Sequence, residues 1–399
     1  MGKPSSIALL YAARAARGFG DGFAAIILPA YLTELGFKPL QVGFVATSAL
    51  LGTAIMTLGV GYLASRYKLR NLLLVSALIM IATGVAFANA TLLPLLVMVA
   101  FAGTANPSAG DIGIFVPLEH AMLSREASDR GRTRVFARYS LVGGSAAAAG
   151  ALGASAPDLF VAMGVGKIAA LQVMFYAYGA LGFAGLALYR LLPHDLSQDG
   201  AEQRSSPLGP SRGIVYRLAA LFSLDAFAGG FAVQSLVALW LFKRFDMSLG
   251  AASVFFFWSN SLAALSYPVA ARLSQRFGLV NTMVFTHIPS SACLILAAFL
   301  PNLTGVLALL LIRAALSQMD VPTRTSYVMA VVTPAERPAA ASVTAVPRSL
   351  ASSISPTLAG ALLSTAFSGL PLVVCGSLKI IYDLSLLLSF RHLKPPEES

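Results

Sequence analysis

The chain has 399 residues, of which 57% are hydrophobic and only 11% charged, and its mean hydropathy is +0.76. An ordinary soluble domain contains about 25% charged residues, so this composition excludes a soluble globular protein and indicates one that lies in lipid. The net charge of +11 would suit a nucleic-acid-binding protein. The basic residues are spread over many short loops, however, so we expect membrane lipids and not nucleic acid as partners.

The apolar residues form about twelve blocks, and most are long enough, at ~20 residues, for a helix to cross the hydrocarbon core of a bilayer. Continuous apolar runs such as residues 72–82 argue against the alternating pattern of outer-membrane strands. The sequence therefore predicts an all-α membrane protein with twelve transmembrane helices, at residues 7–34, 40–64, 71–90, 94–123, 135–156, 167–191, 216–242, 248–273, 279–299, 303–330, 340–365 and 370–391.

Lysine and arginine residues are concentrated in alternate loops, which orients a membrane protein. The loops after the second, fourth and eighth spans are basic, whereas those after the third, ninth and eleventh have no lysine or arginine. This bias places both termini in the cytoplasm. We expect a multi-pass protein of a bacterial inner (plasma) membrane, and a monomer.

A polar segment rich in proline and serine, residues 192–214, separates two halves of six spans each. We therefore predict an N-terminal bundle at 1–191, a cytoplasmic linker at 192–214 and a C-terminal bundle at 215–399. The halves repeat some features, since Arg66 and Tyr67 after the second span correspond to Arg276 and Phe277 after the eighth. Internal repetition of this kind is expected in secondary transporters, whose site lies between the repeats.

With these features the sequence resembles the major facilitator superfamily over nearly its whole length. The resemblance implies a cytoplasmic loop motif, and Gly61, Arg66, Arg70, Arg276 and Gly278 match it. Ser65 and Gln275 stand where that motif usually has an acid, which weakens the case for gating by salt bridges in these loops. The resemblance also implies a central cavity lined by the first, fourth, seventh and tenth helices, and it is closest to the drug and metabolite efflux branch.

Ionisable residues within the spans are the candidates for function, because each costs roughly 2.5–3.5 kcal/mol at the centre of a bilayer unless it is paired or faces water. Arg17 and Asp21, and likewise Asp320 and Arg324, are four residues apart, so each pair lies on one helical face. The proton-coupling candidates are Asp21, Asp225 and Asp320. The substrate-cavity candidates are Arg17, Asp111, Glu119, Arg313, Arg324 and Tyr327.

Each candidate also has a structural interpretation. The acid–base pairs, including Lys379 and Asp383 in the last span, would then only neutralise each other and hold the bundle together. His120 and His287 would be packed or interfacial, and Tyr327 could contact lipid or neighbouring helices.

The sequence shows no pattern of an enzyme, a cofactor or a metal. The two cysteines, Cys293 and Cys375, lie in different spans, and no histidine pair has zinc spacing. We therefore predict a secondary active transporter that moves a small organic molecule by alternating access, with proton-coupled efflux favoured. Proton-coupled uptake of an organic anion is the alternative, and a non-transporting membrane sensor or scaffold on the same fold is the alternative of another class.

Overall fold

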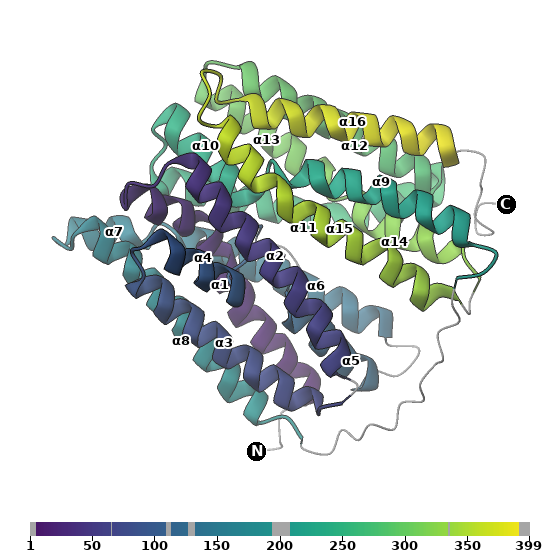
Figure 1. Cartoon of the computed structure of the whole chain (residues 1–399), viewed down its shortest axis with the longest axis horizontal. Helices are drawn as coiled ribbons and strands as arrows, with labels where there is room; N and C mark the ends of the chain where they lie inside the picture. Colours follow the sequence, from purple (N-terminus) through teal and green to yellow (C-terminus); the bar gives the residue numbers. More distant parts are fainter. Residues whose placement is uncertain are drawn as a thin grey trace. The chain divides into compact units, whose positions relative to one another are not determined.

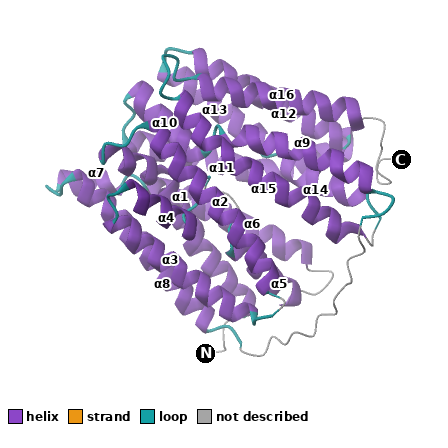
Figure 2. Cartoon of the chain, viewed as in Figure 1, coloured by secondary structure: helices purple, strands orange, loops and turns teal. Residues whose placement is uncertain are grey.

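The computed structural model describes residues 5–64, 66–108, 113–126, 132–193, 208–333 and 336–390. Every regular element in this part is a helix, as Figure 2 shows. In chain order the helices are α1 Ser6–Glu34, α2 Pro39–Leu63, α3 Leu69–Asn89, α4 Leu93–Ala102, α5 Phe115–Glu126, α6 Arg132–Gly153, α7 Ala156–Ala162, α8 Lys167–Arg190, α9 Arg212–Gly230, α10 Gln234–Phe245, α11 Leu249–Phe277, α12 Leu279–Phe299, α13 Leu303–Ser317, α14 Asp320–Ala330, α15 Arg337–Leu362 and α16 Leu370–Phe390 (Figure 1).

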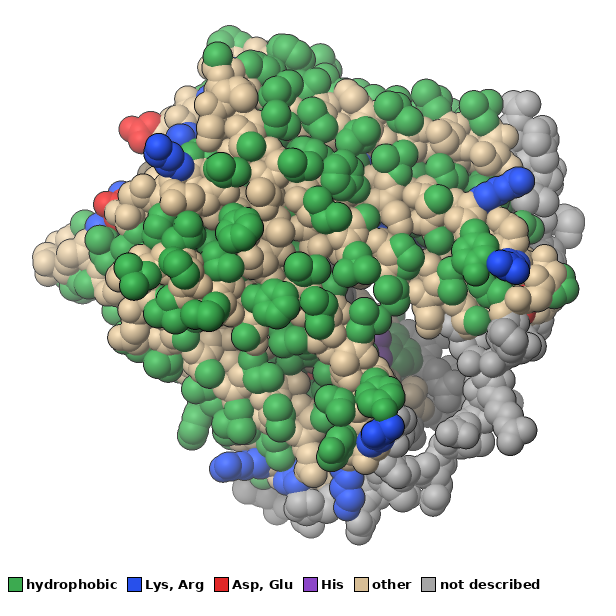
Figure 3. Space-filling view, in the orientation of Figure 1, with side chains coloured by type: hydrophobic (Ala, Val, Ile, Leu, Met, Phe, Trp, Pro, Cys, Tyr) green, Lys and Arg blue, Asp and Glu red, His purple; other side chains and the backbone are tan. Residues whose placement is uncertain are grey.

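Seven helical segments of the described residues have the length and hydropathy to cross a membrane. They are α2, α3, α8, the segment 212–245 that contains α9 and α10, α11, α12 and α16, and the shorter apolar helices α4 and α13 add to them. Figure 3 shows that the visible face is largely hydrophobic, with lysine and arginine side chains mostly near its edges. Apolar side chains outside and few charges are what a lipid environment requires.

Three of the twelve predicted spans are interrupted. The fourth consists of α4 and α5, the seventh of α9 and α10, and the tenth of α13 and α14. Backbone that leaves the helix at membrane depth is tolerated where it is covered by protein or borders a cavity. Interruptions at corresponding positions of the two halves, here the fourth and tenth spans, indicate where a transporter binds its substrate.

The chain packs as two compact units, and residues 233–260 are grouped with the N-terminal ones. Unit 1 contains Met1–Asp199 and Val233–Asn260, and unit 2 contains Gly200–Ala232 and Ser261–Ser399. In unit 1 the backbone N–H of Ser235 at α10 donates to the carbonyl of Pro107 at 3.0 Å, which joins α10 to the N-terminal helices. The division of the bundles at residues 192–214 thus stays a prediction.

Small residues let the helices of unit 1 approach closely. A Cβ at Gly22 of α1 would lie 2.1 Å from the carbonyl oxygen of Ala147 in α6, and one at Gly150 would lie 2.0 Å from that of Phe19. Lipid provides no hydrophobic driving force between helices, so the van der Waals contact of closely spaced backbones stabilises their packing instead. The face of α1 that carries its ionisable residues is thereby held in one register against α6.

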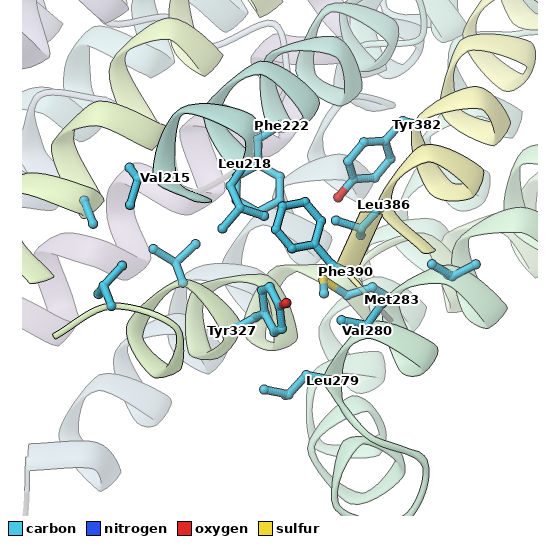
Figure 4. Close-up of a cluster of buried hydrophobic side chains, with 14 residues drawn as sticks. Val215, Leu218, Phe222, Leu279, Val280, Met283, Tyr327, Tyr382, Leu386 and Phe390 are labelled. Atoms are coloured by element: carbon cyan, nitrogen blue, oxygen red, sulfur yellow. The ribbon is translucent and has the colours of Figure 1, made fainter. Parts of the chain in front are cut away.

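Unit 2 has a hydrophobic core formed by α9, α12, α14, α15 and α16. Figure 4 shows its side chains, among them Phe222, Tyr327, Tyr382 and Phe390. Tyr327 and Phe390 pack edge to face with their ring centroids 6.0 Å apart. This core fixes the helices that bring the charged residues of unit 2 together.

Candidate functional site: buried ionic clusters in both units

The first cluster lies in unit 1 and is centred on Glu119 of α5. Arg17 of α1 donates to one carboxylate oxygen at 2.8 Å, and Tyr139 of α6 donates to the same oxygen. Tyr189 of α8 donates to the other oxygen at 2.6 Å. We call these four residues the Glu119 cluster. Its carboxylate is fully buried, and charge-assisted hydrogen bonds among four helices compensate for the loss of water.

Asp21 lies one helical turn beyond Arg17 on α1, and its setting differs. It is 5% exposed, and its carboxylate accepts a hydrogen bond from Tyr178 of α8 at 3.3 Å. The same phenol oxygen is 3.2 Å from the hydroxyl of Thr104. Among the described residues, Tyr178 is the one hydrogen-bond partner of Asp21, and the ion pair of Arg17 is made with Glu119 rather than with Asp21.

A pocket of unit 1 borders both residues. It has room for about one water molecule, and it is lined by Arg17, Asp21, Thr53, Met56, Gly103, Thr104, Gly113, Ile114 and Phe115. The lining combines one carboxylate and hydroxyl groups with an aromatic ring, over which the Arg17 guanidinium lies at 4.6 Å from the centroid. Polar groups that converge on one space are a feature of small-molecule sites.

The second cluster lies in unit 2. Arg324 of α14 donates to Asp320 at 2.9 Å and to Asp225 of α9 at 3.2 Å, and Lys379 of α16 donates to the other oxygen of Asp225 at 2.6 Å. Nδ1 of His287 in α12 is 3.0 Å from each carboxylate oxygen of Asp383. These six residues, which we call the Asp225 cluster, join four helices of unit 2.

Both clusters lie beside the interrupted spans. Glu119 is in α5, which follows α4 after the break, and Asp225 lies one turn before α9 ends at Gly230. Asp320 begins α14, where its carboxylate faces the positive end of the helix dipole. Charged groups are therefore placed where the helices are discontinuous, which is the arrangement of ion and substrate sites in transporters.

The remaining cavity candidates are placed differently. Tyr327 is fully buried in the hydrophobic core of unit 2, which favours a packing role over substrate contact. Arg313 is half-buried on α13, and its backbone carbonyl accepts from Ser290 of α12 at 3.4 Å. Asp111 lies outside the described residues.

The residues of the cytoplasmic loop motif are spread over separate local contacts. Arg70 ties the start of α3 to the end of α8, because its guanidinium donates to the carbonyl of Tyr189 at 3.3 Å and to that of Arg190 at 2.7 Å. Arg66 lies over the ring of Tyr62 at 4.4 Å, and Arg276 over that of Phe277 at 5.5 Å. Gly278 precedes α12 with φ of +85°, a conformation that favours glycine, and Gly61 has open space around it.

Sequence reasoning missed several members of the clusters and the partner of Asp21. The tyrosines Tyr139, Tyr178 and Tyr189 were not candidates, since a tyrosine in an apolar span is usually packing. Lys379 and Asp383 share a helical face but do not pair with each other: Lys379 holds Asp225, and Asp383 holds His287. The four-residue spacing within the last span was the one available signal.

Comparisons with known proteins agree with this architecture. The family model of the Major Facilitator Superfamily matches residues 10–312. A relative from Saccharomyces cerevisiae, the uncharacterized membrane protein YJR124C, is 23% identical over 326 residues, or 73% of each chain.

Solved structures of transporters share the fold at low sequence identity. A mutant of the nucleoside transporter NupG is 14% identical, with a TM-score of 0.76 over 97% of this chain and 100% of that one. The xylose transporter XylE from E. coli is also 14% identical, with a TM-score of 0.74 over 96% and 95%. A bacterial homologue of the human lysosomal transporter Spinster is 15% identical, with a TM-score of 0.72 over 96% of each. This chain is therefore a multi-pass membrane protein with the twelve-helix fold of two six-helix bundles, and it belongs to the Major Facilitator Superfamily.

Proposed function

We propose that this protein is a proton-coupled secondary transporter that exports a small organic molecule by alternating access. The observation that carries the proposal is the setting of Asp21, which borders the pocket of unit 1 and has Tyr178, and no cation, as its hydrogen-bond partner in the described structure. A carboxylate in that position is free to take up and release a proton without breaking an ion pair.

The other two proton-coupling candidates have a different setting. Arg324 holds both Asp225 and Asp320, and Lys379 holds Asp225 as well. Protonation of Asp225 would leave Lys379 without its counter-ion, and protonation of Asp320 would leave Arg324 and Lys379 to share Asp225. Both changes remove a buried counter-ion, which is costly. We propose that these two acids have a structural role in the Asp225 cluster. Asp21 is then the carboxyl group that exchanges protons with the medium.

Export follows from competition at this carboxylate. Asp21 would bind either a proton or the positive or hydrogen-bonding end of a substrate, but not both at once. Binding of the proton then releases the substrate and binding of the substrate releases the proton, so the two cross the membrane in opposite directions. The resemblance of the sequence motifs to the efflux branch favours the same direction. Uptake of an organic anion is the second candidate, with Arg313 and Arg324 as the guanidinium groups that would bind the anion. Arg324 is already compensated by Asp225 and Asp320, so this alternative depends on Arg313.

The test uses the purified chain in lipid vesicles with an imposed pH gradient, a pH-sensitive dye inside and a panel of organic cations and anions. We expect cations to move against the proton flow, and Asp21→Asn to abolish the coupling while it leaves folding intact. Glu34→Gln is the control, because Glu34 forms an exposed ion pair with Lys167 at 2.8 Å. Accumulation of anions together with protons would support the uptake alternative, and the absence of any flux would favour a sensor or scaffold.

A further inference from the structure

His287 is the one histidine of the described residues that lies within the hydrogen-bonded clusters, and it connects two of the charged groups of α16. Its Nδ1 is 3.0 Å from both oxygens of Asp383, and its Nε2 is 3.3 Å from Nζ of Lys379. The imidazole is 2% exposed and the carboxylate of Asp383 is fully buried. Neither residue has a place in the function proposed above.

The contacts of the ring define its protonation state. A carboxylate accepts hydrogen bonds, so Nδ1 carries the hydrogen that faces Asp383. A lysine ammonium has only donors, so Nε2 must offer a lone pair to Lys379. These contacts are those of a neutral imidazole, in the tautomer with the hydrogen on Nδ1, placed between an ammonium donor and a carboxylate acceptor.

We propose that His287 is a proton-binding site, and that a proton on its Nε2 displaces Lys379 from the imidazole and from Asp225. Nε2–H and the ammonium of Lys379 cannot remain at 3.3 Å, since both are positively charged donors. Oδ1 of Asp225 is the nearest acceptor for the new N–H, at 3.9 Å from Nε2. That same oxygen is the one that Lys379 holds in the neutral state.

The proton therefore exchanges the cation that holds Oδ1 of Asp225, while Arg324 keeps the other oxygen. In the neutral state the cation at Oδ1 is Lys379, and in the protonated state it is the His287 imidazolium. Lys379 is the most exposed member of the ion pairs of the cluster, with 13% of its side chain accessible, so it is the cation that leaves Asp225 in this proposal. Asp225 lies one turn before the break between α9 and α10, so the exchange acts directly beside an interrupted helix.

The charges that face the histidine are compatible with an imidazolium. The Asp225 cluster contains three acids against the two permanent cations Arg324 and Lys379, so one added positive charge balances it. Outside the hydrogen bonds of the cluster, Arg348 of α15 is close enough to interact electrostatically with Asp225 and Asp320, and Arg313 lies on the adjacent α13. Both arginines disfavour an added positive charge. The stability of the imidazolium therefore depends on its direct contact with the Asp383 carboxylate. Cys375 of α16 and Tyr382, whose ring packs edge-on at 6.1 Å, are the other titratable groups nearby.

The first test observes the proton directly and does not require a substrate. The chain has four histidines, so the full-length protein with ¹⁵N-labelled histidine in lipid nanodiscs gives few imidazole signals, and His287→Gln identifies those of His287. We expect Nε2 of His287 to change from an unprotonated to a protonated nitrogen as the pH is lowered through the window of the titration, starting from the tautomer with hydrogen on Nδ1. In Asp383→Asn this change should be lost from that window, because the imidazolium has lost its counter-ion.

The second test connects the proton to transport, and this step rests on the function proposed above. The variant His287→Gln retains a donor for Asp383 and an acceptor for Lys379, but it binds no proton. We expect it to fold and to lose the pH dependence of vesicle flux, whereas the control His120→Gln in unit 1 should retain it. An Nε2 signal that stays constant over the window, a proton found on Asp383 in place of His287, or an unchanged pH profile in His287→Gln would each overturn the proposal. Absence of flux in the unmodified protein would instead refute the transport function, while the nanodisc titration would still decide the proton site.

Discussion

Arg17 and Glu119 lie 102 residues apart in the sequence and meet at 2.8 Å in the interior of unit 1. Their side chains are 7% and 0% exposed, so neither charge has more than slight access to water. Tyr139 and Tyr189 complete the hydrogen bonds of the carboxylate. The pair joins α1 to α5 beside the pocket. The main role of Arg17 is therefore to compensate the charge of Glu119, and binding of a substrate is secondary.

Removal of one partner of this pair should destabilise the protein strongly. Glu119→Gln leaves the Arg17 guanidinium buried without a counter-ion, which typically costs about 3–5 kcal/mol. We expect a large fall in the thermal unfolding temperature in detergent. The double variant Arg17→Gln with Glu119→Gln, which contains no buried charge at this pair, should be more stable than Glu119→Gln alone. Additive losses in the two single variants and the double variant would show that the two residues do not interact energetically.

The fold was largely predictable from the sequence. The twelve apolar blocks match the helices closely, and the helix at 7–34 is found at Ser6–Glu34. The interruptions in three spans were not foreseen, because the residues at the breaks, such as Gln318 and Met319, barely change the hydropathy of a long span. A break depends on backbone partners from neighbouring helices, and a single sequence does not reveal these partners.

The site was predictable by residue type but not by pairing. Four-residue spacing correctly predicted the ion pair of Asp320 and Arg324. The same spacing would join Arg17 to Asp21, yet Arg17 pairs with Glu119. Helical spacing predicts which side chains share a face of one helix. A buried charged group, however, pairs with the residues that satisfy most of its hydrogen bonds, and these are often on another helix.

The close approach of α1 and α6 should make Gly150 intolerant of a side chain. In Gly150→Ala the new methyl group would meet the backbone carbonyl of Phe19, so one helix must shift, and overpacking of this kind costs about 1–3 kcal/mol. Gly59→Ala is the matched control, since a Cβ there has no neighbour within 4 Å. Thermal unfolding in detergent compares the two, and equal unfolding temperatures would contradict the packing argument.

The pocket of unit 1 should be blocked by a large side chain at Met56. This residue lines the pocket, and a tryptophan there would fill the space between its walls. If the pocket holds the substrate, Met56→Trp should abolish flux in vesicles while thermal unfolding stays near that of the unmodified protein. Leu58→Trp is the control on the same helix, because Leu58 is 46% exposed. Normal flux in Met56→Trp would exclude this pocket from the substrate path.

Glu336, in the loop between α14 and α15, should make stability depend on pH. Its carboxylate accepts from the hydroxyl of Thr333 at 2.6 Å, from that of Ser211 at 2.7 Å and from the backbone N–H of Gly209. These hydrogen bonds lower the pKa of Glu336 from its ordinary 4.5 to about 2. Because the pKa is lower in the folded state than in the unfolded state, the carboxylate stabilises the fold above pH 4.5, and this contribution is lost as the pH falls toward 2.

The variant Glu336→Gln isolates this contribution, because an amide accepts fewer hydrogen bonds and does not titrate. We expect it to unfold at a lower temperature than the unmodified protein at neutral pH, and the difference between the two should shrink as the pH is lowered below 4.5. Digestion by a protease at residues 208–211 should also become faster at neutral pH, since Ser211 and Gly209 lose the group that holds them. Glu126→Gln, at the exposed end of α5, is the matched control and should change neither property. A stability difference that stays constant with pH would mean that the charge of Glu336 does not anchor this segment.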